Sequence, residues 1–115
     1  MVELRLAPNG EAATTLELDH TVPIEMAGSG AGALFVGPGW DGALMALGLY
    51  LGGEISADPV AGANSPEAQE FSRQSVHAWV AAIEASGTAT AEEITTMTAM
   101  VMGQWAPDSA PTPDN

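Results

Sequence analysis

Alternation of apolar and polar residues marks the first twenty positions. Residues 2–6 alternate apolar and charged side chains, the period-two pattern of a half-buried strand. Pro8-Asn9-Gly10 is typical of a turn, because proline fixes φ and Asn-Gly tolerates positive φ. Residues 13–22 alternate again, and the two stretches together predict an antiparallel hairpin. The residues that share one face of the second strand are Leu16, Leu18 and His20.

An unbroken apolar run then indicates a helix over residues 39–51, between Gly37-Pro38-Gly39 and Gly52-Gly53. Because this segment is apolar on almost every side, we expect a buried helix that other elements cover from all directions. Gly48 in its middle costs about 1 kcal/mol relative to alanine, which favours close approach of a strand or ligand there. The residues that form one stripe at three- and four-residue spacing are Trp40, Leu44, Leu47 and Leu51.

Two amphipathic helices are predicted after residue 65. Ser65-Pro66-Glu67 combines a capping residue, a first-turn proline and an acid, and the helix is expected to end at Gly87. Thr90-Ala91-Glu92-Glu93 is a capping box that begins the last helix, which reaches about Trp105. The apolar face of the first of these helices is expected to contain Phe71, Ser75, Val76, Trp79, Val80 and Ile83.

Two further segments lack periodicity. Residues 23–39 are rich in glycine and alanine, but they match neither G-x-G-x-x-G nor a Gly-Lys-Ser/Thr motif, so we expect a flexible linker rather than a phosphate site. Residues 106–115 are mostly proline, aspartate, serine and threonine, a composition that predicts a disordered tail.

Charge narrows the range of partners. The net charge is −13, lysine is absent, and the cations are Arg5 and Arg73. Nucleic acids and anionic membranes need Lys and Arg to neutralise phosphate, so neither is an expected partner. The chain has no cysteine, and its first residues do not resemble a signal peptide. Residues 31–53 are interrupted by Pro38 and Asp41, so a cytoplasmic protein without a membrane span is expected.

Candidate chemistry is sparse. Strand alternation puts His20 on the face opposite Glu17 and Asp19, and His77 lacks a second ligand one helical turn away. We therefore expect no metal and no cofactor, and the residues do not compose a catalytic set. The three Trp and six Met indicate core packing, although methionine also suits a permissive pocket.

The order of these elements resembles the C-terminal part of the helix-grip (START-like, or SRPBCC) superfamily. The most specific motif is Gly39-Trp40-Asp41-Gly42-Ala43-Leu44, preceded by the hairpin. Its nearest branch is the Aha type, named as homologues of the activator of the ninety-kilodalton heat-shock protein's ATPase. The resemblance implies an α+β fold in which residues 1–55 are the C-terminal portion of a helix-grip domain, residues 56–105 are a helical extension found in some actinobacterial members, and residues 106–115 are the tail.

In that family a curved sheet encloses an apolar cavity against the long helix, and most of that sheet has no counterpart here. Three explanations stay open: a truncated product, a self-assembling half-domain, or a misassigned start. The resemblance implies a small module that binds a hydrophobic small molecule and self-associates, and no catalysis of its own is expected. The ligand-binding residues would be Trp40, Leu44, Leu47, Tyr50 and Leu51.

The same resemblance implies two alternatives. Some helix-grip proteins are polyketide cyclases or dehydratases, and in such an enzyme the candidate acid–base residues would be His20, Asp41 and Tyr50. The branch name also suggests a co-chaperone that binds a heat-shock ATPase.

Overall fold

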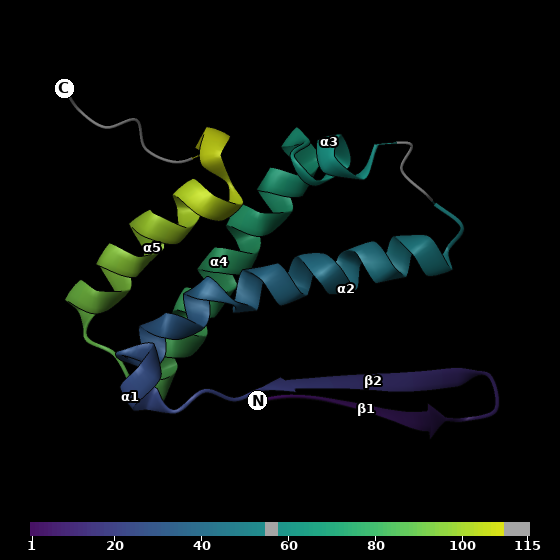
Figure 1. The fold of residues 1–115 in the computed structure, drawn as a ribbon, viewed down its shortest axis with the longest axis horizontal. Helices are drawn as coiled ribbons and strands as arrows, with labels where there is room; N and C mark the ends of the chain where they lie inside the picture. Colours follow the sequence, from purple (N-terminus) through teal and green to yellow (C-terminus); the bar gives the residue numbers. More distant parts are fainter. Residues whose placement is uncertain (55–57, 110–115) are drawn as a thin grey trace.

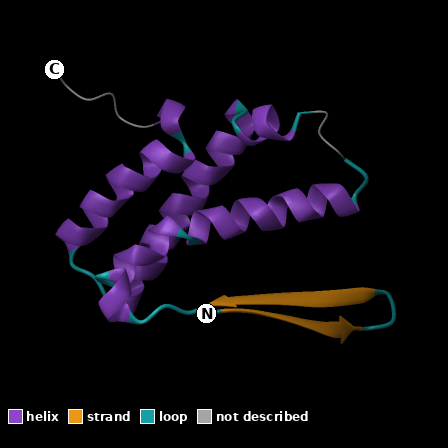
Figure 2. Ribbon diagram, viewed as in Figure 1, coloured by secondary structure: helices purple, strands orange, loops and turns teal. Residues whose placement is uncertain are grey.

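The computed structural model of the protein describes residues 1–54 and 58–109, which fold as the predicted α+β arrangement of a hairpin followed by helices (Figure 1). The helices form a layer, and the hairpin lies beside this layer rather than within it (Figure 2). The elements in chain order are β1 (Val2–Asn9), β2 (Ala13–His20), α1 (Ile24–Ala27), the 3₁₀ helix η1 (Gly30–Phe35), α2 (Gly37–Leu51), α3 (Pro59–Ala63), α4 (Pro66–Ser86), α5 (Ala91–Trp105) and the 3₁₀ helix η2 (Pro107–Ser109).

The hairpin has the predicted faces. β1 and β2 are antiparallel, and Leu4 lies opposite Leu18 while Leu6 lies opposite Leu16. The charged residues alternate with these on the other face, where Arg5 forms ion pairs with its acidic neighbours. The apolar face is left largely open, since Leu6 is 71% exposed. The hairpin therefore contributes nothing to the buried core of the described residues.

The core is built by three helical segments instead. Ala31 and Leu34 of η1 are fully buried, together with Val76 of α4 and Val101 of α5. η1, α4 and α5 pack on one another around these side chains. The core thus takes residues from both sides of position 55, where the sequence predicts a domain boundary.

The predicted flexible linker over residues 23–39 is wrong, because this segment contains α1, the buried η1 and the first turn of α2. Its glycines permit close packing. A Cβ at Gly30 would lie 1.8 Å from Thr88 Oγ1, and one at Gly37 would lie 2.4 Å from the Trp79 ring. The small residues of this segment allow neighbouring side chains to pack against the backbone. Composition alone does not distinguish such a packed segment from a flexible one.

The ends of α4 and α5 confirm their predicted caps. The Ser65 hydroxyl accepts a hydrogen bond from the Ala68 N–H, and Gly87 ends α4 in the left-handed region with φ of 68°. Thr90 and Glu93 form the reciprocal capping box. Hydrogen bonding from the Ser29 side chain and from Thr90 lowers the pKa of Glu93.

Helix α2 is not the buried centre that its composition predicts. It packs against α4 and η1, and its buried residues are Gly37 and Pro38 at its first turn. Leu47 is 41% exposed and Leu51 is 74% exposed. Among the described elements the hairpin contacts the far side of this helix at Trp40, and Leu44, Leu47 and Leu51 stay exposed, so the helix is not covered on all sides as its sequence predicts.

The ordered chain also extends beyond Trp105. Ala106 is fully buried, and the backbone N–H of Asp108 donates a 2.9 Å hydrogen bond to Gln69 Oε1. Gln69 Nε2 in turn donates to Asp108 Oδ2 at 2.8 Å. The predicted disordered tail is therefore wrong for residues 106–109, which α4 holds through this buried glutamine. Residues 110–115 lie outside the described residues.

Candidate ligand-binding groove

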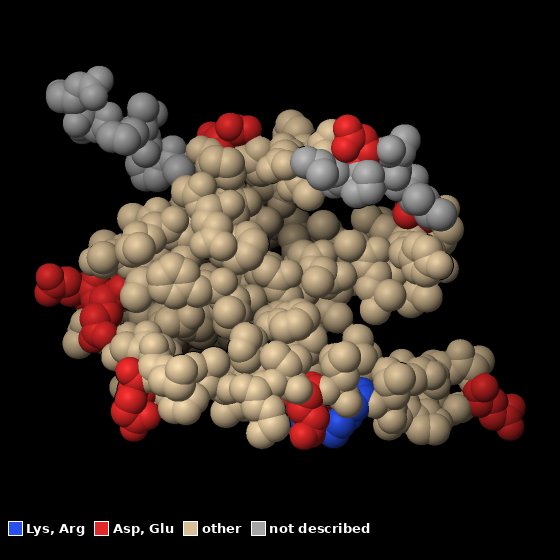
Figure 3. All heavy atoms as spheres, viewed as in Figure 1, with Lys and Arg blue, Asp and Glu red and all other residues tan. Residues whose placement is uncertain are grey.

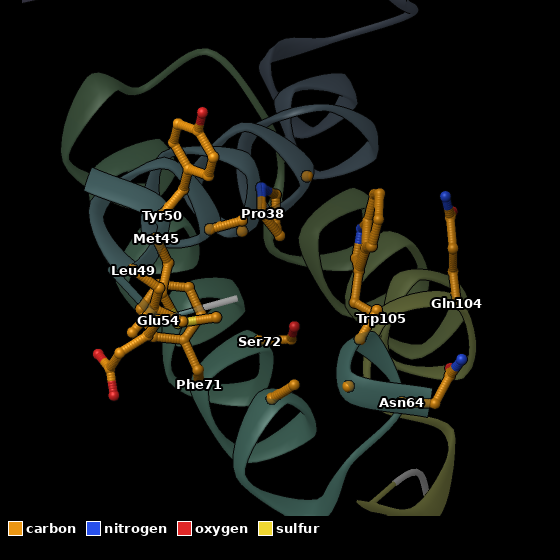
Figure 4. A pocket seen from close by; sticks show the side chains of 16 residues that line it. Pro38, Met45, Leu49, Tyr50, Glu54, Asn64, Phe71, Ser72, Gln104 and Trp105 are labelled. Atoms are coloured by element: carbon orange, nitrogen blue, oxygen red, sulfur yellow. The ribbon is translucent and has the colours of Figure 1, made fainter. Parts of the chain in front are cut away.

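An apolar groove of about 630 Å³ opens between α2 and the helices that face it, α3, α4 and α5 (Figure 4). Its walls are mainly aliphatic and aromatic, and its polar side chains are few. The lining residues are Pro38, Gly39, Gly42, Met45, Ala46, Leu49, Tyr50, Glu54, Gly62, Ala63, Asn64, Ala68, Phe71, Ser72, Gln104 and Trp105.

The α2 wall follows from helical spacing. Pro38, Gly42, Met45 and Leu49 recur every three or four residues, so they form one stripe along the helix, and all of them line the groove. The absence of a side chain at Gly42 leaves open space, because nothing lies within 4 Å of a Cβ placed there. A side chain at this position would therefore extend into the groove.

Asp41 fixes α2 against α4 beside the groove. Its Oδ2 accepts a 2.6 Å hydrogen bond from Ser75 Oγ and a 2.9 Å hydrogen bond from Trp79 Nε1. Ser75 is buried. A carboxylate that accepts from two donors of a neighbouring helix holds the two helices in register, because hydrogen bonds to a charged acceptor are the stronger ones.

The opposite wall carries two aromatic side chains. Phe71 comes from α4 and Trp105 from the last residue of α5. Trp105 Nε1 donates a 3.3 Å hydrogen bond to the backbone oxygen of Leu34, which fixes the ring. Gly39 allows this placement, since a Cβ there would lie 2.8 Å from the Trp105 ring.

Of the five predicted ligand-binding residues, Tyr50 alone lines the groove, and it is 64% exposed. Trp40, Leu44, Leu47 and Leu51 lie outside the lining. Trp40 contacts the hairpin instead, donating a 2.9 Å hydrogen bond from Nε1 to His20 Nδ1 with the two rings edge to face at 6.0 Å. Helix α2 thus has two apolar sides: one forms the groove, and the stripe that contains Trp40 is the other.

The three candidate acid–base residues do not form a group. His20 Nδ1 accepts from Trp40, and Asp41 accepts from Ser75 and Trp79. Tyr50 follows Asp41 by nine residues on α2, about 13 Å along the helix axis. Each side chain has its own environment, so the structure does not bring the three together as an acid–base set.

Groove residues missed by the sequence reasoning were Met45, Leu49, Phe71 and Trp105, which the apolar pattern assigns to flank or core positions. The sequence signal that could have found Met45 and Leu49 is the Pro38-Gly42-Met45-Leu49 stripe, which matches the Trp40 stripe in spacing. Periodicity alone does not say which side of an all-apolar helix faces a neighbour, because both stripes satisfy it.

Acidic side chains lie along the edge of the molecule and uncharged ones fill the centre of the face drawn in Figure 3. Both arginines are engaged with acids: Arg5 with Glu17 and its neighbours, and Arg73 with Glu70 at 2.6 Å. Hydrogen bonds from Arg73, and then from Gln74, lower the pKa of Glu70 to about 2. No guanidinium group on the described surface is therefore free to bind an anion.

Within residues 1–54 and 58–109, no three His, Asp or Glu side chains lie together in a way that could hold a metal ion. One helical stretch, Gly30–Leu51, is long and apolar enough to cross a membrane, with a mean hydropathy of 1.3. Core helices of soluble proteins and signal sequences meet the same criterion, so this stretch decides nothing about location, and the cytoplasmic assignment stays a prediction.

No family description, curated protein or solved structure matches this chain. The helix-grip relationship, and with it the cyclase and co-chaperone alternatives, therefore stay predictions.

Proposed function

We propose that the protein is a binding module for a hydrophobic small molecule, which occupies the groove between α2 and α4. The observation that carries this proposal is the groove itself: about 630 Å³, lined by apolar and aromatic side chains with a few polar groups. Small-molecule sites are typically concave and apolar, with volumes of about 300–1,000 Å³.

Rigid support favours the groove as a binding site. Its α2 wall is tied to α4 through Asp41, and Trp105 is held by the Leu34 carbonyl. Walls that are already in place lose little conformational entropy when a ligand enters. The exposed ring of Tyr50 at the rim can cover part of a bound molecule with a rotation of its side chain.

A helix-grip relationship is part of the same proposal. The hairpin precedes the long apolar helix as that fold requires, and the His20–Trp40 hydrogen bond joins the end of β2 to the first turns of α2. The second apolar side of α2, with Trp40, Leu44, Leu47 and Leu51, would then be the side on which further sheet packs.

Two glycines of α2 provide the test. Gly42 lines the groove and Gly48 does not, and neither has any atom within 4 Å of an added Cβ. Both substitutions to methionine remove a helical glycine, so both variants should fold. Only Gly42→Met places a side chain in the groove.

Calorimetric titration with naphthylmethanol, a neutral apolar probe, measures the effect. We expect saturable binding to the wild type, at least about tenfold weaker binding to Gly42→Met, and affinity within about twofold of wild type for Gly48→Met, since filling a pocket removes its apolar contacts. Equal affinities of the two variants, or no binding to the wild type, would contradict the proposal.

A further inference from the structure

Resting on the function proposed above, we propose that the groove selects cationic apolar ligands, such as aromatic or alkyl amines, over apolar carboxylates, and that Glu54 is the residue that discriminates between them.

Among the described residues, the groove lining contains one acidic side chain, Glu54. Its other polar members include Asn64, Ser72 and Gln104, which are uncharged, and no described Lys or Arg lines it. A ligand that carries a positive group therefore finds a counter-charge in the groove, and one that carries a negative group finds repulsion.

The backbone of Glu54 is fixed at the rim of the groove. Its backbone N–H donates a 2.9 Å hydrogen bond to the backbone oxygen of Leu49, whose side chain lines the groove. Figure 4 shows Glu54 at the side of the groove where Leu49 and Phe71 lie, away from Trp105. The Glu54 carboxylate lies on the outer side of that wall, at the mouth of the groove, so a ligand whose apolar body contacts Leu49 and Phe71 reaches it with an amine that extends out of the groove.

The rest of the chain cannot supply the missing cation. The sequence has two strong cations and no lysine. Arg5 is on the hairpin, paired with Glu3, Glu17 and Asp19, and Arg73 is paired with Glu70 on the exposed side of α4. A ligand carboxylate would therefore enter a groove without a counter-charge, in a molecule whose net charge is −13.

The aromatic lining strengthens the same preference. Tyr50, Phe71 and Trp105 all border the groove. An ammonium group is attracted to the face of an aromatic ring, whereas a carboxylate is not.

Three probes with one apolar body test the proposal: naphthylmethylamine, naphthylmethanol and naphthoate. At low salt we expect the amine to bind the wild type roughly twofold to fivefold more tightly than the alcohol, as an exposed ion pair allows. Naphthoate should bind more weakly than the alcohol, and added salt should reduce both differences.

Two variants separate Glu54 from the general field of the molecule. Glu54→Gln and Glu84→Gln each remove one negative charge, but Glu84 is exposed on α4 and does not line the groove. We expect Glu54→Gln to abolish most of the amine preference while its affinity for the alcohol is kept, and Glu84→Gln to retain the preference.

The outcomes distinguish the two proposals. If the alcohol does not bind, the groove is not a ligand site and both proposals fail. If the alcohol binds but naphthoate binds as tightly as the amine, the groove stands and the selectivity is wrong. An amine preference that survives in Glu54→Gln would also overturn the assignment, since it would arise from the whole acidic surface.

Discussion

At the scale of single residues, the glycines of this chain serve two opposite purposes. Gly30, Gly37 and Gly39 lie where a Cβ would overlap a neighbouring side chain, so they allow η1 and the start of α2 to approach α4 and α5. Gly42 and Gly48 have open space around them, and Gly42 leaves room in the groove. Substitutions to alanine should therefore have opposite effects in the two groups.

Gly37→Ala is expected to lower the free energy of unfolding by about 1–3 kcal/mol, because overpacking against a fixed ring strains the core. The ring is Trp79, whose Cε2 atom would lie 2.4 Å from the new Cβ. Gly48→Ala should instead raise the free energy of unfolding by up to about 1 kcal/mol through helix propensity. Urea denaturation of both variants measures these changes, and a Gly48→Ala variant less stable than the wild type would contradict the expected gain in helix propensity.

Asp41 is the residue whose loss should loosen the groove most directly. Asp41→Ala removes the acceptor of Ser75 Oγ and Trp79 Nε1. We expect it to cost about 1–3 kcal/mol of unfolding free energy, because a buried donor is left without a partner. In a double-mutant cycle, Ser75→Ala should cost less in the Asp41→Ala background than in the wild type. Additive effects would show that the 2.6 Å contact is not energetically coupled.

At the scale of elements, local signals in the sequence were sufficient to predict the type of β1, β2, α4 and α5 and the caps of the two helices. Alternation predicted β1 and β2, and the caps at Ser65, Gly87 and Thr90 placed α4 and α5. Such signals are read from neighbouring residues, so no tertiary information is needed.

Long-range contacts were what the sequence could not supply. The burial of η1 depends on its packing against α4 and α5. Residues 106–109 are held by Gln69 of α4, which lies 39 positions before its hydrogen-bond partner Asp108 in the sequence. The groove depends on which apolar stripe of α2 meets α4. Since both stripes are apolar, the sequence pointed to the Trp40 stripe, whereas the groove uses the stripe of Met45 and Leu49.

The Glu70–Arg73 pair on α4 gives this element a dependence on acid. The pKa of the Glu70 carboxyl is lowered from its ordinary value of 4.5 to about 2. The ion pair therefore stabilises the fold fully above pH 4.5, and this stabilisation is lost as the pH falls toward 2. Glu70→Gln should therefore be less stable than wild type at neutral pH and equal to it near pH 2. Salt should shrink the difference because the pair is exposed, and Glu84→Gln serves as the control. A difference that is independent of pH would show that the ion pair contributes nothing.

At the scale of the whole molecule, two exposed apolar surfaces favour association between copies of the chain, and the high negative charge opposes it. The apolar face of the hairpin and the Trp40 stripe of α2 are both open, and β1 and β2 have no further strand partners among the described residues. Open apolar faces and strand edges favour association, whereas a net charge of −13 on every copy opposes it.

We therefore expect self-association that strengthens with added salt, because salt screens the repulsion while it leaves apolar contacts in place. Leu6→Glu, at a position 71% exposed on the hairpin, should weaken it. Met100→Glu, which adds the same charge at a position 57% exposed on α5, should not. Sedimentation velocity measures both variants, and a wild-type monomer at every salt concentration would contradict this expectation.

We propose that an apolar ligand occupies the groove between α2 and α4. The three indole N–H signals in a nitrogen–proton correlation spectrum test it most directly, once Trp-to-Phe variants have assigned them. Trp105 lines the groove, whereas Trp40 bonds to His20 and Trp79 bonds to Asp41. On titration with naphthylmethanol, we expect a saturable shift that is largest for Trp105 and that Gly42→Met abolishes. A larger shift at Trp40, or no saturable shift at any indole, would contradict it.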